Sequence, residues 1–369
     1  MDPVVVVGGG IVGTSVAAHF AEAGLPVACY ERDSLGGGTT AASVAMFVWH
    51  QSSPDPTAHA LRERSWETYG PLVEAGTLDF DRIGGLYLEE RPETCETHRT
   101  TASDLESLGV RTELLAPADL ERFGLATDHL HGALSVPDEG YLDPNEVVQH
   151  FVGEVRDAGG TVETGAAVTD VVVEGGRAVG VDVEGDRVDA SAVVNAAGPW
   201  APAVDAMAGV SHPLRNNRGQ ILVLDHGTDP PLPFVEFEDG HYVRGEGTRQ
   251  VFAGGYGARY EDAARLDPDA ARSVDESFSL AAVERFERFL PALVDARVAT
   301  DWVGLRTITP DGNPLVGATD REGYYVATGL SGLGVTLAPA VGSVLADVVA
   351  PDRECDPAVR AFLSPTRFG

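Results

Sequence analysis

The N-terminal part of the chain alternates short apolar runs with stretches of helical spacing. Residues 4–7 form an unbroken run of valines, the pattern of a strand that is buried on both faces. Residues 11–23 have helical periodicity and end at Gly24, a residue type that often terminates helices. A second apolar run follows at residues 26–30. This strand–helix–strand order predicts parallel strands covered by helices.

The remaining pattern predicts further helices at residues 57–76, 143–158 and 276–295. Short strands are predicted between residues 77 and 140 and between 211 and 260, and a strand meander or small crossing sheet between 161 and 189. Residues 192–195 and 324–328 have the pattern of buried strands, and each runs into small residues and then a helix. Together these elements predict an α/β protein with a nucleotide-binding sheet and a second, antiparallel sheet.

Composition excludes several classes of chemistry. The 369 residues carry a formal net charge of −31, and every one of the 26 basic residues is arginine. The absence of lysine excludes a Schiff-base lysine, a pyridoxal-phosphate anchor and a P-loop lysine. A chain this acidic should repel nucleic acid and anionic lipid. The dispersed acids are typical of a surface adapted to a salt-rich cytoplasm, where ions screen the repulsion.

Cysteine and histidine spacing predicts neither a metal site nor a disulfide framework. Cys29, Cys95 and Cys355 are far apart and odd in number, and the ten histidines form no HExxH motif. The first residues lack the basic start of a signal peptide, and no apolar run reaches the roughly 18 residues of a membrane span. We therefore expect a cytoplasmic protein without a transmembrane segment.

The first glycine-rich motif stands in the context that dinucleotide binding requires. Gly8, Gly10 and Gly13 fit GxGxxG directly after the first strand and at the start of the helix. The first glycine allows a tight turn, the second lets the backbone approach a pyrophosphate, and the third allows close helix packing. Glu31 ends the second strand, where it can accept hydrogen bonds from a ribose. The motif alone does not distinguish FAD from NAD.

A second glycine-rich loop favours FAD. Residues 36–43, GGGTTAAS, follow Glu31, Arg32 and Asp33 and could enclose a pyrophosphate from its other side. An NAD-binding domain usually continues with another strand and helix at this point, whereas this chain enters the apolar stretch SVAMFVWHQ.

Five segments resemble the FAD-dependent amino-acid and amine oxidoreductases of the D-amino-acid oxidase type. This family includes glycine oxidase, sarcosine oxidase and sarcosine or proline dehydrogenases. The segments are VVVVGGGIVG, VVNAAGPWA, LRNNRGQI, GLRTITPDGNPLVG and YVATGLSGLGVTLAPAVG, and together they span nearly the whole chain. The first is shared by many flavoproteins, and the last two are much more specific as a pair.

The resemblance implies a Rossmann-like FAD-binding domain made of residues 1–76, 141–212 and 298–369. An α+β substrate domain with an antiparallel sheet would comprise residues 77–140 and 213–297. It also implies that Arg306 holds a substrate carboxylate, that Tyr242 caps it, and that the 331–335 turn lies against the flavin. His50 is a further candidate facing the flavin. The motifs and the resemblance together assign cofactor contacts to Gly8, Gly10, Ile11, Val12, Gly13, Glu31, Arg32, Thr39, Thr40, Ser43, Val168, Ala197, Gly198, Gly304, Gly332, Leu333, Gly334, Val335 and Thr336.

Departures from the family pattern sharpen the prediction. No cysteine stands near Gly304, so FAD should be bound non-covalently. No lysine is available to assist reaction with oxygen, which slightly favours a dehydrogenase that passes electrons to an acceptor protein or quinone. Where glycine oxidases carry a second arginine in the C-terminal turn, this chain has Leu333 or a neighbour, which argues against glycine as the substrate.

The predicted reaction oxidises a small amino acid or N-methyl amine, such as a D-amino acid, glycine, sarcosine or proline. Hydride would pass from the α-carbon to flavin N5, and the imine would hydrolyse. Three alternatives stay open: a 2-hydroxy-acid or glycerol-phosphate dehydrogenase, with His50 as its only candidate base; a non-catalytic flavoprotein subunit; and an NAD-dependent dehydrogenase. As an alternative to anion binding, Arg306 could be a surface charge or part of an ion pair between domains.

Overall fold

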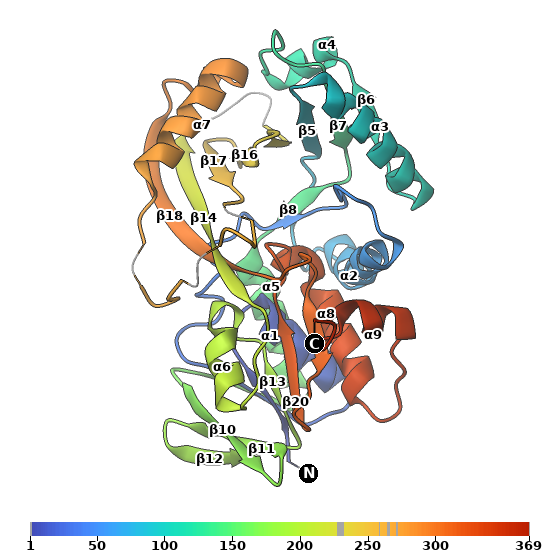
Figure 1. Cartoon of the computed structure of the whole chain (residues 1–369), viewed down its shortest axis with the longest axis vertical. Coiled ribbons are helices and arrows are strands. Elements are labelled where there is room, and N and C mark those ends of the chain that lie inside the picture. Colours follow the sequence, from blue (N-terminus) through green and yellow to red (C-terminus); the bar gives the residue numbers. More distant parts are fainter. Residues whose placement is uncertain (1, 227–231, 258, 264–265, 271, 369) are drawn as a thin grey trace.

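The protein is described by a computed structural model that covers residues 2–226, 232–257, 259–263, 266–270 and 272–368. The strands of these residues form four sheets, and the two largest lie at opposite ends of the molecule (Figure 1). One end holds both described termini and a six-stranded sheet, and the other holds an eight-stranded sheet.

The six-stranded sheet has the strand order β19-β20-β13-β1-β2-β9. Its strands are parallel except for β19, which pairs antiparallel to β20. The bounds are β1 Val4–Val7, β2 Val27–Glu31, β9 Thr161–Thr164, β13 Ala192–Asn195, β19 Leu315–Ala318 and β20 Tyr324–Thr328. The expected strand at 161–165 is therefore the sheet edge beside β2 rather than part of a meander.

Both faces of this sheet are covered, which explains its uninterrupted apolar strands. Val4 and Val6 point into a core that they share with helices, whereas Val5 and Val7 point into a core that they share with a three-stranded antiparallel sheet. The helices are α1 Ile11–Glu22, α2 Pro56–Glu74, α5 Pro144–Asp157, α8 Gly334–Val349 and α9 Pro357–Leu363. The small sheet is β10 Val168–Glu174, β11 Arg177–Val183 and β12 Asp186–Asp189, with α6 Ala201–Met207 on the same side.

The eight-stranded sheet has the order β18-β14-β17-β16-β15-β5-β7-β6 and is antiparallel except where β15 pairs with β5. Its strands are β5 Gly85–Glu89, β6 Glu113–Leu115, β7 Gly132–Val136, β14 Arg215–Asp225, β15 Phe234–Glu236, β16 His241–Glu246, β17 Gln250–Gly255 and β18 Arg297–Ile308. The helices of this region are α3 Pro92–Ser107, α4 Pro117–Leu120 and α7 Glu276–Phe289. The expected helix at 276–295 thus ends at Phe289.

The two faces of the large sheet differ. Val235 and Val243 point into a core with α7 on the outer face, whereas Phe234 and Tyr242 point to the opposite, inner face. The second three-stranded sheet has β3 Met46–Phe47 and β4 Phe80–Asp81 flanking β8 Gly140–Leu142, and β8 lies between the two largest sheets (Figure 1). β18 continues from the large sheet past the predicted boundary at residue 298, because it pairs with β14 as far as Ile308.

Candidate cofactor cavity and active site

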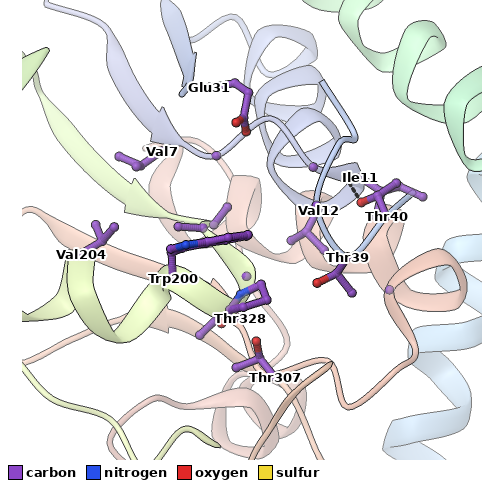
Figure 2. A pocket seen from close by; sticks show the side chains of 18 of the residues that line it. Val7, Ile11, Val12, Glu31, Thr39, Thr40, Trp200, Val204, Thr307 and Thr328 are labelled. Atoms are coloured by element: carbon purple, nitrogen blue, oxygen red, sulfur yellow. Dashed lines mark hydrogen bonds between the residues drawn. The ribbon is translucent and has the colours of Figure 1, made fainter. Parts of the chain in front are cut away.

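A cavity of about 650 Å³ opens beside the carboxyl ends of β1, β2 and β13. This is where ligands bind in open parallel α/β sheets. Figure 2 shows Ile11, Val12, Glu31, Thr39 and Thr40 at this cavity. The predicted cofactor residues that line it are Gly8, Gly10, Ile11, Val12, Glu31, Arg32, Thr39, Thr40, Ser43, Val168, Ala197, Gly198, Gly332, Gly334 and Val335.

The glycines of the first motif are required by backbone packing. Gly8 has φ +109°, and a Cβ atom built there would lie 2.7 Å from the carbonyl oxygen of Ala196 on the neighbouring strand. A Cβ at Gly13 would lie 1.9 Å from the carbonyl oxygen of Gly8, so this glycine lets α1 approach the first turn. Gly13 therefore shapes the cavity without lining it.

Two side chains hold the positive end of α1 beside the cavity. The Thr40 hydroxyl accepts a hydrogen bond from the Ile11 amide at 3.1 Å, the contact drawn in Figure 2. The Glu31 carboxylate accepts hydrogen bonds from the amides of Gly9 at 2.7 Å and Asp33 at 2.8 Å. Glu31 is thereby fixed at the cavity wall, where the ribose of a dinucleotide would lie.

Arg32 contributes to a small cluster at the same end. Its guanidinium lies 4.2 Å from the centroid of the Trp200 ring and forms a 2.7 Å ion pair with Asp269. The Trp200 indole also donates to Asp269, at 2.9 Å. Trp200 and Asp269 line the cavity. Trp200 stands in the segment VVNAAGPWA, but the sequence analysis predicted a cofactor contact for neither residue.

The second glycine-rich loop connects the cofactor cavity to the large sheet. The Thr39 hydroxyl donates to the carbonyl oxygen of Leu305 at 2.6 Å, and the Trp302 indole donates to that of Ala42 at 3.1 Å. Gly304 lies against this loop, since a Cβ there would meet the Ala42 side chain at 2.7 Å. Gly304 thus allows β18 to pack against the loop and does not itself line the cavity.

The C-terminal turn brings a second helix N-terminus to the cavity. Gly332, Gly334 and Val335 line it at the start of α8. Leu333 instead packs against the apolar core, and the buried Thr336 hydroxyl donates to the carbonyl oxygen of Met46 at 3.1 Å. These last two residues position the turn and do not line the cavity, although the sequence predicted cofactor contacts for both.

Arg306 lines the cavity from β18 and passes beside the C-terminal turn. A Cβ at Gly332 would lie 3.2 Å from Arg306 Cδ, so only glycine leaves full room for this side chain. Burial lowers the pKa of Arg306 from its usual value. Among the described residues its Nε has no hydrogen-bond partner, and the ion pairs found there include none to Arg306. Its contacts are Asn217 Oδ1, 3.4 Å from Nη2, and the ring of Tyr256.

Two tyrosines and a glutamate lie next to Arg306 on the inner face of the large sheet. The Tyr256 ring centroid is 5.2 Å from Arg306 Cζ and 5.2 Å from the Tyr242 ring centroid. The Tyr256 hydroxyl donates to Glu236 Oε2 at 2.6 Å. Burial raises the pKa of Glu236 to about 7. Tyr242 interacts electrostatically with Arg306, and its predicted contact with a substrate carboxylate stays a prediction. Tyr256 and Glu236 carry no motif that would have identified them.

His50 lies in a second cavity of about 190 Å³ and not in the cofactor cavity. Its ring stacks on Tyr87 with centroids 3.6 Å apart, and burial lowers its pKa to about 3. The backbone amides of Trp49 and His50 donate to Glu139 Oε1 at 2.8 and 2.7 Å, and the Tyr87 hydroxyl donates to Glu139 Oε2 at 2.8 Å. Glu139 is fully buried, and burial raises its pKa to about 7.

The described residues contain neither a metal cluster nor a membrane-spanning helix. No group of three or more metal-ligating side chains lies close together among them. None of the helices described is both long and apolar enough to cross a bilayer.

Comparison with known proteins shows the class to which this fold and site belong. The family model for FAD-dependent oxidoreductases matches residues 3–348, so the chain belongs to that family. The cradle formed by Gly8 and Gly10, with two helix N-termini beside it, fits the pyrophosphate of FAD.

Individual relatives act on amino acids and amines. The chain is 28% identical to a 4-methylaminobutanoate oxidase (formaldehyde-forming) of Paenarthrobacter nicotinovorans, over 94% of this chain and 43% of the relative. It is 27% identical to human mitochondrial sarcosine dehydrogenase, over 93% of this chain and 39% of the relative. Thus the chain spans about four-tenths of these two proteins. A glycine oxidase of Bacillus licheniformis is 26% identical and is covered over 92% of its length.

Among solved structures, the L-proline dehydrogenase from P. horikoshii has a TM-score of 0.89 and 26% identity. The match covers 100% of this chain and 97% of that one. These similarities confirm the expected family, fold class and cofactor.

Proposed function

We infer that this protein oxidises a small amino acid or N-methyl amine that carries a carboxylate. The observation that carries the proposal is Arg306, a half-buried arginine beside the cofactor cavity whose buried Nε has no hydrogen-bond partner among the described residues. Burying an unpaired cation is costly, so the site favours a bound anion. A carboxylate matches the planar guanidinium in geometry as well as in charge.

The chain's own residues would bind and orient the substrate. Arg306 would hold the carboxylate, and Tyr242 and Tyr256 would form the adjacent wall on the inner face of the sheet. FAD, when bound, supplies the acceptor for the hydride that leaves the substrate carbon. Fixing the carboxylate determines which carbon faces that acceptor, and correct placement of this kind can lower a barrier by several kcal/mol. The product imine would then hydrolyse in water.

The cavity walls also support non-covalent binding of FAD. Among the described residues that line the cofactor cavity there is no cysteine, and the chain has no lysine. The missing lysine slightly favours a dehydrogenase that delivers electrons to a protein or quinone.

The alcohol-oxidising alternative depended on His50 as the base. Since His50 lines the second cavity and its pKa is lowered to about 3, its placement gives that alternative no support. A non-catalytic flavoprotein subunit would not need a substrate-binding cation, so the alternative does not explain the buried Nε of Arg306 beside the cofactor cavity, which has no partner among the described residues.

Anaerobic reduction of the bound flavin tests the proposal. The purified, FAD-supplemented protein would be mixed in molar KCl with D- and L-amino acids, glycine, sarcosine, proline and 2-hydroxy acids. We expect the visible flavin band to bleach with an amine substrate, and admission of air then distinguishes oxidase from dehydrogenase. Bleaching by hydroxy acids alone would establish the alcohol-oxidising alternative, and bleaching by no compound would overturn the proposal.

A further inference from the structure

One side chain connects the two cavities. Tyr256 contacts Arg306, which lines the cofactor cavity, and its hydroxyl donates to Glu236, which lines the second cavity. Tyr256 is 39% exposed, so its ring is accessible beside Arg306. A substrate whose carboxylate is bound by Arg306 would lie beside the Tyr256 side chain, and the inference below requires its amine to reach the Tyr256 hydroxyl.

Glu236 is placed to accept a proton and not to neutralise Arg306. Its carboxylate accepts the hydrogen bond from Tyr256, and the ion pairs of the described residues include none to Glu236. Its pKa of about 7, raised by burial, lets it accept or release a proton near neutral pH. Glu139 and the phenols of Tyr87, Tyr242 and Tyr256 interact with it electrostatically. Across the second cavity it faces His50, His98 and Arg91.

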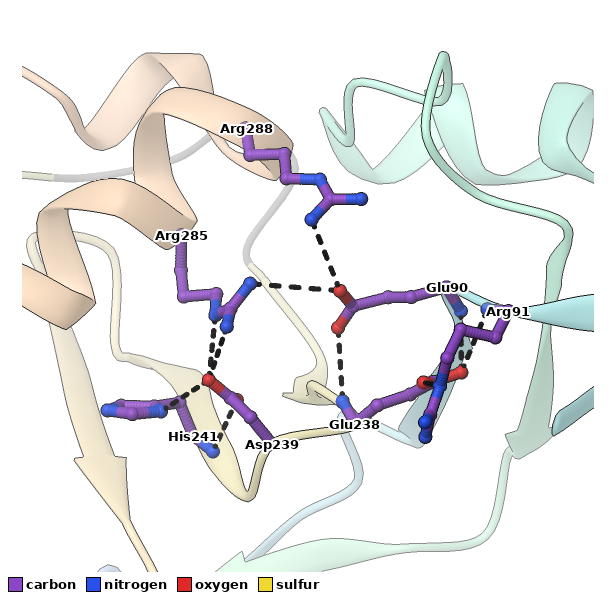
Figure 3. Close-up of polar contacts among 7 residues, drawn as sticks. All are labelled: Glu90, Arg91, Glu238, Asp239, His241, Arg285 and Arg288. Carbon is purple, nitrogen blue, oxygen red and sulfur yellow. Dashed lines mark hydrogen bonds and ion pairs between the residues drawn. The ribbon is translucent and has the colours of Figure 1, made fainter.

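An ionic network beside the second cavity fixes the strand ends that carry Glu236 and Tyr242 (Figure 3). Asp239, in the turn between β15 and β16, is bound by Arg285 of α7 at 2.5 Å and by His241 at 3.0 Å. The Glu238 carboxylate accepts the amide of Glu90 at 2.9 Å, and Glu90 Oε1 accepts that of Glu238 at 3.1 Å. The hairpin is thus tied to β5 and α7, which limits movement of Glu236.

The second cavity connects Glu236 to solvent. Its lining residues Ser52, Arg91 and Thr97 are exposed at the surface of the protein. Water at this rim can exchange protons with a carboxylate inside the cavity.

We propose that Tyr256 and Glu236 form a relay that removes the proton which the substrate amine must lose before oxidation. The ammonium N–H proton passes to Tyr256 Oη while the Tyr256 hydroxyl proton passes to Glu236 Oε2. Glu236 then releases its proton to water through the second cavity. The substrate amine is left neutral with a free electron pair, Tyr256 is unchanged, and one proton has moved from the substrate to solvent. This inference rests on the proposed function, since it requires an amine held by Arg306.

The pH dependence of flavin reduction tests the relay. Glu236→Gln keeps an oxygen that can accept the Tyr256 hydrogen bond but cannot take up a proton. At pH 7 we expect anaerobic flavin reduction to slow about 100-fold, the lower end of the usual range for acid–base catalysis. Near pH 10, close to the pKa of about 10 of an aliphatic amine, the substrate arrives largely neutral and the deficit should nearly disappear. Tyr256→Phe should show the same loss and the same recovery.

A matched control and an independent measurement complete the test. Glu89→Gln removes another buried carboxylate of the same sheet, one paired with His98, and should leave the pH profile unchanged. Infrared titration of protonated carboxyl groups should lose a component near pH 7 in Glu236→Gln, independently of turnover.

The outcomes separate this inference from the proposed function. If amines reduce the wild-type flavin but Glu236→Gln follows the wild-type profile at every pH, the relay is wrong and the proposed function stands. A loss in Tyr256→Phe that is equal at pH 7 and pH 10 would likewise overturn the relay. If no amine reduces the wild-type flavin, both proposals fail.

Discussion

The cofactor cavity and the inner face of the large sheet are built in different ways. The cofactor cavity consists mainly of glycines, small residues and two helix N-termini, contributed by turns with strong sequence signatures. The inner face contributes single side chains from four different strands, β5, β15, β16 and β18: Tyr87, Glu236, Tyr242 and Arg306. Substitutions of the cavity glycines should therefore weaken cofactor binding by disturbing the backbone. Substitutions on the inner face should weaken substrate binding by removing a charge or a hydrogen bond.

The largest effect is expected from Gly13→Ala. The new methyl group would overlap the carbonyl oxygen of Gly8, because a Cβ at Gly13 lies only 1.9 Å from it. Moving α1 away would disrupt the first turn, so we expect a loss of more than about 3 kcal/mol of stability and of flavin binding. Thermal unfolding and flavin retention during gel filtration would measure both.

Gly153→Ala is the matched control for this substitution. Gly153 lies inside α5, and a Cβ added there would have nothing within 4 Å, so alanine should stabilise the helix by up to about 1 kcal/mol. If the two variants had the same thermal stability and the same flavin retention, the overlap between a Cβ at Gly13 and the Gly8 carbonyl oxygen would not explain the effect.

Arg306→Ala should have the next largest effect, on the substrate site alone. Removing a charge-assisted contact of about 2–3 kcal/mol should lower the second-order rate of flavin reduction roughly 30- to 150-fold. Arg306→Lys keeps the charge but loses the planar fork, so it should recover only part of that rate. Stopped-flow reduction measures the effect, and the flavin content of both variants should equal that of the wild type. Loss of flavin instead would mean that Arg306 belongs to the cofactor site.

Glu139→Gln should alter how stability depends on pH. Because burial raises the pKa of Glu139 to about 7, the folded state binds more protons than the unfolded state between about pH 4.5 and 7. The contribution of Glu139 to stability is therefore present at low pH and is lost as pH rises through its folded pKa. Glutamine does not titrate. From pH 5 to pH 8, the free energy of unfolding of the variant should therefore rise by on the order of 2 kcal/mol relative to that of the wild type. Urea unfolding at the two pH values checks this, and parallel pH profiles would show that Glu139 does not titrate in this window.

How much could be predicted from the sequence depends on the same contrast between the two regions. Gly8, Gly10 and Glu31 could be assigned because a tight turn beside a pyrophosphate admits few residue types. Gly304 and Thr336, for which cofactor contacts were predicted, do not line the cavity, since proximity in sequence to a motif does not determine which way a residue points. Gly304 faces Ala42, and Thr336 holds Met46.

The acidic residues of the site could not be predicted, for a physical reason. Glu236 and Glu139 stand among 57 acidic residues, and nothing local distinguishes them. Their properties come from neighbours that are distant in the sequence: Glu236 lines a cavity with His50 and Tyr87, and Glu139 accepts hydrogen bonds from the His50 amide and the Tyr87 hydroxyl. The domain boundary near residue 298 is difficult to predict from the sequence for a similar reason. The strand that carries Arg306 begins in the large sheet and ends beside the cofactor cavity.

The smallest effect is expected from Tyr242→Phe. Tyr242 is 7% exposed and its ring packs between Phe234 and Tyr256, so phenylalanine should preserve the packing and the fold. If its hydroxyl caps the substrate carboxylate, the variant loses one hydrogen bond, worth about 1 kcal/mol, and the substrate concentration for half-maximal reduction should rise about fivefold. The maximal rate and its pH dependence should not change, because the proposed proton relay uses Tyr256. A changed pH profile with unchanged substrate affinity would exchange the roles of the two tyrosines and place the relay on β16.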